Sequence, residues 1–77
     1  MSRFFFDSYE DGQPSEDRDG VEFADSAAAE KAAVQALVSI AGESFAPSDR
    51  AMEMVVRNGE GKAILACTLS LTVRRPA

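Results

Sequence analysis

The stretch SEDRDGVEFADS suggests calcium chemistry, because closely spaced carboxylates are the usual oxygen ligands of that ion. Counted from Ser15, a calcium-binding loop would have Asp17, Asp19 and Gly20 at its third, fifth and sixth positions. The first and twelfth positions, normally Asp and a bidentate Glu, are held by Ser15 and Ser26. We therefore predict no metal site, and interpret the stretch as a solvated acidic turn that ends in a helix cap.

Cys67 is the only cysteine, and the chain contains no histidine. An internal disulfide is therefore impossible, and a structural zinc site is excluded in practice. A nucleophilic cysteine needs a neighbouring base or a positive environment. Cys67 instead shares the apolar face of a predicted strand with Leu65 and Leu69, which indicates a small core residue.

No other motif predicts catalysis. Paired carboxylates acting as general acid and base need a cleft that shifts their pKa values, and a two-layer domain of 77 residues leaves little room for one. Residues 58–62, NGEGK, lack the spacing of a phosphate-binding loop and are typical of a hairpin turn. We predict that the protein is not an enzyme, has no catalytic residue and uses no cofactor.

Charge is divided unevenly along the chain. Residues 7–25 hold eight acidic residues and one base, whereas the C-terminal third is basic, and the net charge is −5. Nucleic-acid binding needs basic side chains clustered on one face, and these are separated by a turn and a strand. Binding through the C-terminal arginines is therefore kept only as an alternative function. The basic residues are Arg50, Arg57, Lys62, Arg74 and Arg75.

The elements that position these residues form a single domain over residues 1–77. Residues 3–9 predict an aromatic strand, and residues 10–20 a turn with a short, irregular return strand around residues 13–16. Residues 21–23 fit a further short strand. Residues 24–44 predict an amphipathic helix, and residues 51–75 a hairpin. The fold class is α+β, a two-layer β-β-α-β-β arrangement with one helix on one face of an antiparallel sheet. The strand order 2-1-3-4 places the aromatic strand centrally.

The helix is expected to begin at an N-cap, Asp25 or Ser26, and to stop at Gly42. Its spacing puts five apolar residues on one side, namely Ala33, Val34, Leu37, Ile40 and Ala41. Together with the strand periodicity, it predicts a core between helix and sheet. The predicted core residues are Phe4, Phe6, Phe23, Leu37, Ile40, Met54, Leu65, Leu69 and Leu71.

Three motifs carry a resemblance to a known family: RFFFDSYEDG, then DRDGVEFAD before an alanine-rich helix, then VVRNGEGKAILACTLSLTV. Together they resemble short proteobacterial proteins known only as a domain of unknown function. The resemblance implies the same fold, a bacterial origin and no established activity. Ser15 departs from the family pattern, because an apolar residue is expected at this position. This departure predicts that the second strand is irregular.

A weaker resemblance is to HicB-type antitoxin domains, which also place a strand pair, an acidic turn and a helix in this order. It implies, as a further alternative, an antitoxin-like function with a toxin partner. The G-C segment typical of those domains is missing from this chain.

The sequence predicts a cytoplasmic protein. No stretch approaches the roughly 18 apolar residues of a membrane helix, and the N-terminus lacks a signal-peptide pattern. The unpaired cysteine agrees with a reducing compartment.

The three consecutive phenylalanines predict an interaction surface. Phe4 and Phe6 are expected to point inward, because the other register would bury Arg3 and Asp7. Phe5 and its neighbours then face away from the helix, where a second copy or another protein could cover them. Alternatively, Arg3, Asp7 and the chain's own loop 13–19 fold across the ring and shield it within the monomer. The candidate interaction patch consists of Phe5, Tyr9 and Val55.

Overall fold

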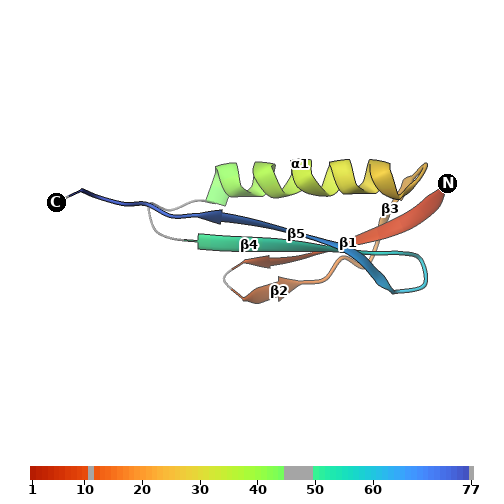
Figure 1. Cartoon of the computed structure of the whole chain (residues 1–77). Coiled ribbons are helices and arrows are strands. Elements are labelled where there is room, and N and C mark those ends of the chain that lie inside the picture. The colour runs from red at the N-terminus through yellow and green to blue at the C-terminus, as the bar shows by residue number, and fades with distance from the viewer. Residues whose placement is uncertain (11, 45–49, 77) are drawn as a thin grey trace.

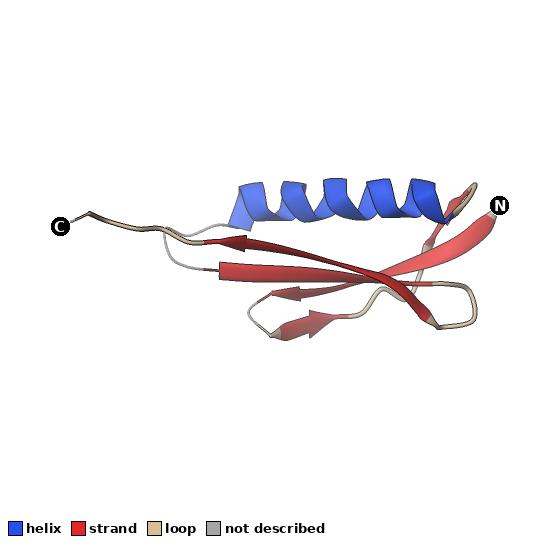
Figure 2. Cartoon of the chain, in the orientation of Figure 1, coloured by secondary structure: helices blue, strands red, loops and turns tan. Residues whose placement is uncertain are grey.

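The computed structural model describes residues 1–10, 12–44 and 50–76. It is a two-layer molecule in which one helix lies along one face of a sheet (Figures 1 and 2), so the predicted α+β class is confirmed. The elements are β1 (Ser2–Glu10), β2 (Gln13–Ser15), β3 (Val21–Phe23), α1 (Ser26–Ser44), β4 (Arg50–Arg57) and β5 (Ala63–Leu71).

The sheet has the order β2-β1-β4-β5, all its pairs are antiparallel, and β1 is central as predicted. The two short strands expected around residues 13–16 and 21–23 are both present, as β2 and β3, and they pair with different parts of β1, so the β-β-α-β-β arrangement has one further strand. Ser8 pairs with Ser15 but Arg3 pairs with Glu22, so the return segment gains two residues between the two pairings. Those extra residues belong to the acidic loop 16–20.

Asp25 caps α1. Its Oδ1 accepts a hydrogen bond from the Ala28 amide at 2.9 Å, which satisfies an amide of the first helical turn and confirms one of the two predicted caps. The predicted stop at Gly42 is wrong, because α1 continues to Ser44. Gly42 does not adopt the positive φ that ends helices at glycine, so it is simply an exposed helical residue.

The core lies between α1 and the centre of the sheet. It consists of Phe4, Ala29, Ala33, Leu37, Ala41, Met52, Met54 and Val56. Partly buried residues pack around it, namely Phe6, Phe23, Ala36, Ile40, Leu65, Cys67 and Leu69. Phe23 brings β3 into this cluster, because its ring lies 6.3 Å from that of Phe4 and 5.8 Å from that of Phe6.

Two predicted inward positions are wrong. Val34 is 48 % exposed, because the inner face of α1 is instead a row of residues spaced by four, namely Ala29, Ala33, Leu37 and Ala41. These alanines let the helix approach β4 closely, and this orientation turns Val34 outward. Leu71 is 36 % exposed, because it is the last residue of an edge strand.

Candidate interaction surface

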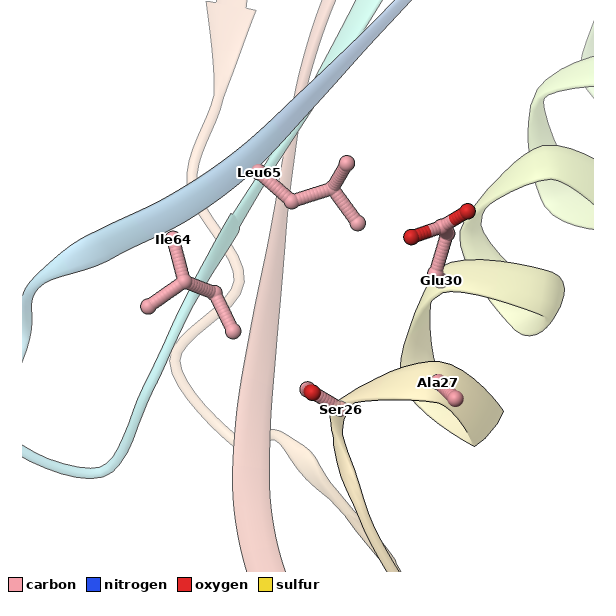
Figure 3. A pocket seen from close by; sticks show the side chains of 5 residues that line it. All are labelled: Ser26, Ala27, Glu30, Ile64 and Leu65. Carbon is pink, nitrogen blue, oxygen red and sulfur yellow. The ribbon is translucent and has the colours of Figure 1, made fainter.

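A wedge-shaped hollow of about 360 Å³ lies between the start of α1 and β5 (Figure 3). Its lining residues are Ser26, Ala27, Glu30, Ile64 and Leu65. Glu30 is the only ionisable group among them, so the wedge has no acid–base pair. It is an opening between the two layers.

The sheet face opposite α1 carries the predicted patch. In the pairing of β1 with β4, Phe5 lies opposite Arg57, Asp7 opposite Val55, and Tyr9 opposite Glu53. Side chains directly opposite one another share a face, and so do alternate residues along a strand. The structure therefore brings Phe5, Tyr9 and Val55 together, and all three are half-buried. We call this surface the open face.

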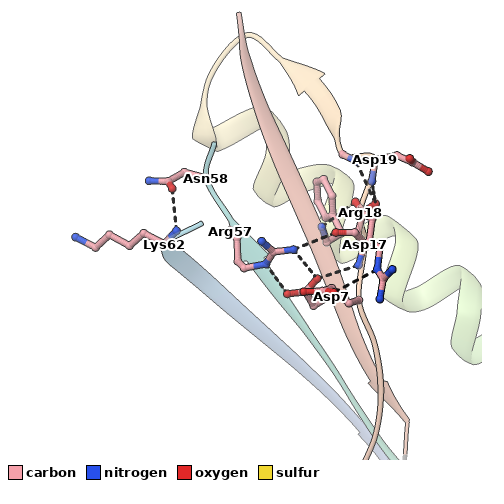
Figure 4. A network of polar contacts seen from close by, with 10 residues as sticks. Asp7, Asp17, Arg18, Asp19, Arg57, Asn58 and Lys62 are labelled. Atoms are coloured by element: carbon pink, nitrogen blue, oxygen red, sulfur yellow. Dashed lines mark hydrogen bonds and ion pairs between the residues drawn. The ribbon is translucent and has the colours of Figure 1, made fainter. Parts of the chain in front are cut away.

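One end of the open face is covered by the acidic loop 16–20, which a network of ion-pair and hydrogen-bond contacts holds in place (Figure 4). Arg57 makes two contacts to the Asp7 carboxylate, from Nε at 2.6 Å and from Nη2 at 3.1 Å. Nη2 also donates to the carbonyl oxygen of Asp17 at 3.0 Å, and the Asp17 amide donates to Asp7 at 3.0 Å. The loop is thereby tied to both β1 and β4.

The Asp17 side chain closes the gap between β2 and β3. Its Oδ2 accepts the backbone amide of Phe6 at 3.1 Å, which the interrupted pairing would otherwise leave without a partner. Its Oδ1 accepts the amides of Asp19 and Gly20, both at 3.1 Å. Asp17, which the sequence placed at a calcium-ligand position, thus accepts the hydrogen bond from β1 that a paired strand would otherwise accept.

Phe5 lies beneath this loop. The guanidinium carbon of Arg57 is 5.1 Å from the centre of its ring, within the range of a cation–π contact. Gly20 has a φ of +71°, and a Cβ placed there would lie 2.9 Å from both Phe5 Cε2 and the Phe4 carbonyl oxygen. Within one chain, Arg57 and Gly20 therefore partly cover the ring, although neither belongs to the loop 13–19 expected to shield it. The accessible part of the patch is centred on Tyr9.

Tyr9 separates two shallow hollows on the open face. One, of about 210 Å³, is lined by Asp7, Tyr9, Pro14, Ser15 and Glu16. The other, of about 330 Å³, is lined by Tyr9, Gly12, Ala51, Met52, Glu53 and Thr68. Sequence reasoning missed the second set, because it joins three strands and a turn that are distant in the chain.

A family model matches most of the chain, including the first two motifs and most of the third. That model, a domain of unknown function (DUF6894), covers residues 3–70. The chain belongs to the DUF6894 family. No curated protein and no solved structure matches the sequence, and nothing supports the resemblance to HicB-type antitoxin domains.

Asp7 and Asp17, whose carboxylates hold the acidic loop of this DUF6894 domain in place, both have lowered pKa values. The hydrogen bonds from Arg57, with that of the Asp17 amide, hold the pKa of Asp7 below its ordinary value despite burial. Burial acts to raise the pKa of Asp17, but the amides of Gly20, Phe6 and Asp19 outweigh it, and the pKa is lowered. Both groups are therefore stabilised as carboxylates, the state that the loop needs.

Burial, followed by the charge of Glu30, raises the pKa of the Cys67 thiol of this DUF6894 domain. This favours the neutral thiol and opposes nucleophilic activity. The side chain is half-buried among the residues that pack on the core.

Several arginines of the DUF6894 domain are held by acidic or carbonyl groups. Arg3 lies 3.6 Å from Glu22 and donates to the carbonyl oxygen of Asp19 at 2.8 Å. Arg18 lies 3.5 Å from Glu16. Arg57 is bound to Asp7, as described above. Across the described ranges, no helix is long and apolar enough to cross a bilayer.

Proposed function

We propose that this DUF6894 domain is a non-catalytic protein-binding module whose open face around Tyr9 receives a basic segment of another protein. The observation that carries the proposal is the position of Tyr9, half-buried between two hollows on the sheet face that α1 leaves uncovered. Tyrosine combines a large apolar ring with a hydroxyl group, and it is enriched among residues that dominate binding energies.

The charge around Tyr9 supports a basic partner. Glu16 lines one hollow and Glu53 the other. Acidic residues at the rim of a binding surface favour partners of opposite charge and speed their association. A second copy packed sheet against sheet would bring the same acidic rim against itself, so a different protein fits this face better.

The ionisable groups support binding rather than catalysis. Asp7 and Asp17 are committed to the loop network. Glu30 stands alone in the wedge, and the Cys67 thiol has a raised pKa. A catalytic site needs groups with complementary proton affinities close together. These observations favour the open face as a surface for recognition.

Selection from a displayed library of short peptides, followed by calorimetry with the enriched sequences, tests the proposal. We expect the enriched peptides to be rich in Lys and Arg. Their Kd should rise about tenfold or more with Tyr9→Ser or Glu53→Lys. Glu60→Lys makes the same charge change in an exposed turn and should leave the Kd of these peptides within about twofold. Failure to enrich any peptide whose binding depends on Tyr9 would overturn the proposal.

A further inference from the structure

The two edges of the sheet are built differently. The edge formed by β2 and β3 consists of three-residue strands, contains Pro14 and is bounded by the acidic loop. These features hinder pairing with another chain. The outer edge of β5 pairs with no strand in the described part of the chain, although β5 is nine residues long. Its sequence, AILACTLSL, has neither a charged residue nor a proline, so nothing in it blocks pairing.

The core beneath β5 is also incompletely covered. In β4, the inward residues Met52, Met54 and Val56 are at most 3 % exposed. Their neighbours in β5, which are Leu65, Cys67 and Leu69, are only partly buried. The helix packs on β4, β5 and β3, and no strand in the described part of the chain lies beside the outer edge of β5.

The exposed apolar residues of α1 lie on this same side. Val34 is 48 % exposed and Val38 is 57 % exposed. At about 100° per residue, both fall on the same flank of the helix as Ala27 and Glu30. Those two residues line the wedge together with Ile64 and Leu65 of β5 (Figure 3). The valine flank and the open strand edge therefore form one continuous surface.

We infer that a second copy of this chain occupies that surface, with the β5 strands of the two copies paired antiparallel about a two-fold axis. Such an axis, perpendicular to the sheet, makes one continuous sheet and keeps both helices on one side. Strands lie about 4.8 Å apart, so a helix centred above β4 and β5 would lie about 10 Å from its copy, close to the usual packing distance. Because α1 and β5 run in the same direction (Figure 1), the two helices are antiparallel and the valine flanks meet.

Charge and topology favour a copy of the chain over a different occupant. Most acidic residues lie in residues 7–25, chiefly in β1 and in the loop 16–20 beside β2 and β3, so much of the negative charge lies away from the outer edge of β5. Since the other edge is blocked, pairing at β5 closes after two copies and does not propagate into a fibre. This inference is independent of the proposed peptide-binding function, because both open faces remain accessible on the other side of the joined sheet.

Sedimentation velocity at tens of micromolar tests the inference. We expect a dimer for the wild type and a Kd raised about tenfold or more in Val34→Lys/Val38→Lys, because four ammonium groups would meet near the axis. Gln35→Lys/Ser39→Lys adds the same charges, with the same spacing, to exposed positions further round α1 and should remain dimeric. Tyr9→Ser should also remain dimeric.

Hydrogen exchange locates the contact. Amides of β5 should exchange more slowly in the wild-type dimer than in the Val34→Lys/Val38→Lys variant, whose helix content circular dichroism would show to be unchanged. A monomeric wild type would overturn the inference. A dimer unaffected by the two lysines, or one with β5 amides unprotected, would do the same. None of these outcomes bears on peptide binding at Tyr9.

Discussion

At the scale of single residues, Gly20 fixes how closely the acidic loop approaches β1. It combines a φ of +71° with contacts at which any Cβ would press on the Phe4 carbonyl oxygen and the Phe5 ring. We expect Gly20→Ala to lower the free energy of unfolding by about 1–3 kcal/mol. Gly61→Ala is the matched control, because Gly61 has a φ of +82° with nothing within 4 Å of the added methyl group. Equal losses in chemical denaturation would show that the close approach contributes nothing.

Asp7 should make the free energy of unfolding depend on pH in the acidic range. Its pKa is lowered in the folded protein, so its contribution is complete above the ordinary value of 3.8 and is lost as the pH falls through the folded-state value. We expect the free energy of unfolding to decline below about pH 5, and Asp7→Asn to flatten that decline while costing about 1–2 kcal/mol at neutral pH. Urea titrations across this range provide the measurement. Glu60→Gln, in an exposed turn, should keep the wild-type slope, and an unchanged slope in Asp7→Asn would contradict the role given to the network.

At the scale of elements, α1 packs on the sheet mainly through small side chains, and Leu37 is the large one among its buried residues. Leu37 is 4 % exposed, whereas Leu71 at the end of β5 is 36 % exposed. We expect Leu37→Ala to lower the free energy of unfolding by about 2–5 kcal/mol, which is a large share of the stability of so short a chain. Leu71→Ala deletes the same atoms and should cost about 1 kcal/mol or less, because these atoms are already partly in water. Comparable losses at low protein concentration would show that the inner face of the sheet extends further along β5.

At the scale of the whole molecule, dimerisation at β5 should couple stability to concentration. Anything that binds only the folded state stabilises it by mass action. We expect the melting temperature of the wild type to rise with protein concentration, and that of Val34→Lys/Val38→Lys to stay constant. Calorimetry over a hundredfold range of concentration is the measurement. A constant wild-type melting temperature would contradict the dimer.

The sequence by itself determined the class and order of the elements. Strand alternation, the Asp25 cap and the turn around residues 58–62 are local signals, because each depends on the conformations of neighbouring residues. The same periodicity separated Phe4 from Phe5, since the opposite register would have buried charged groups. Family membership followed from motifs spread along the chain.

Only the tertiary structure decided what each surface faces. The alternation that turned Phe5 outward did not reveal that Arg57 and Gly20 cover it, because these residues lie far from it in the sequence and meet it through sheet pairing and the loop. Val34 had the hydrophobicity of a core residue, but the close packing of small alanines set the rotation of the helix and left it exposed. Local patterns fix which residues share a face, whereas the packing of the layers decides which of those faces is covered.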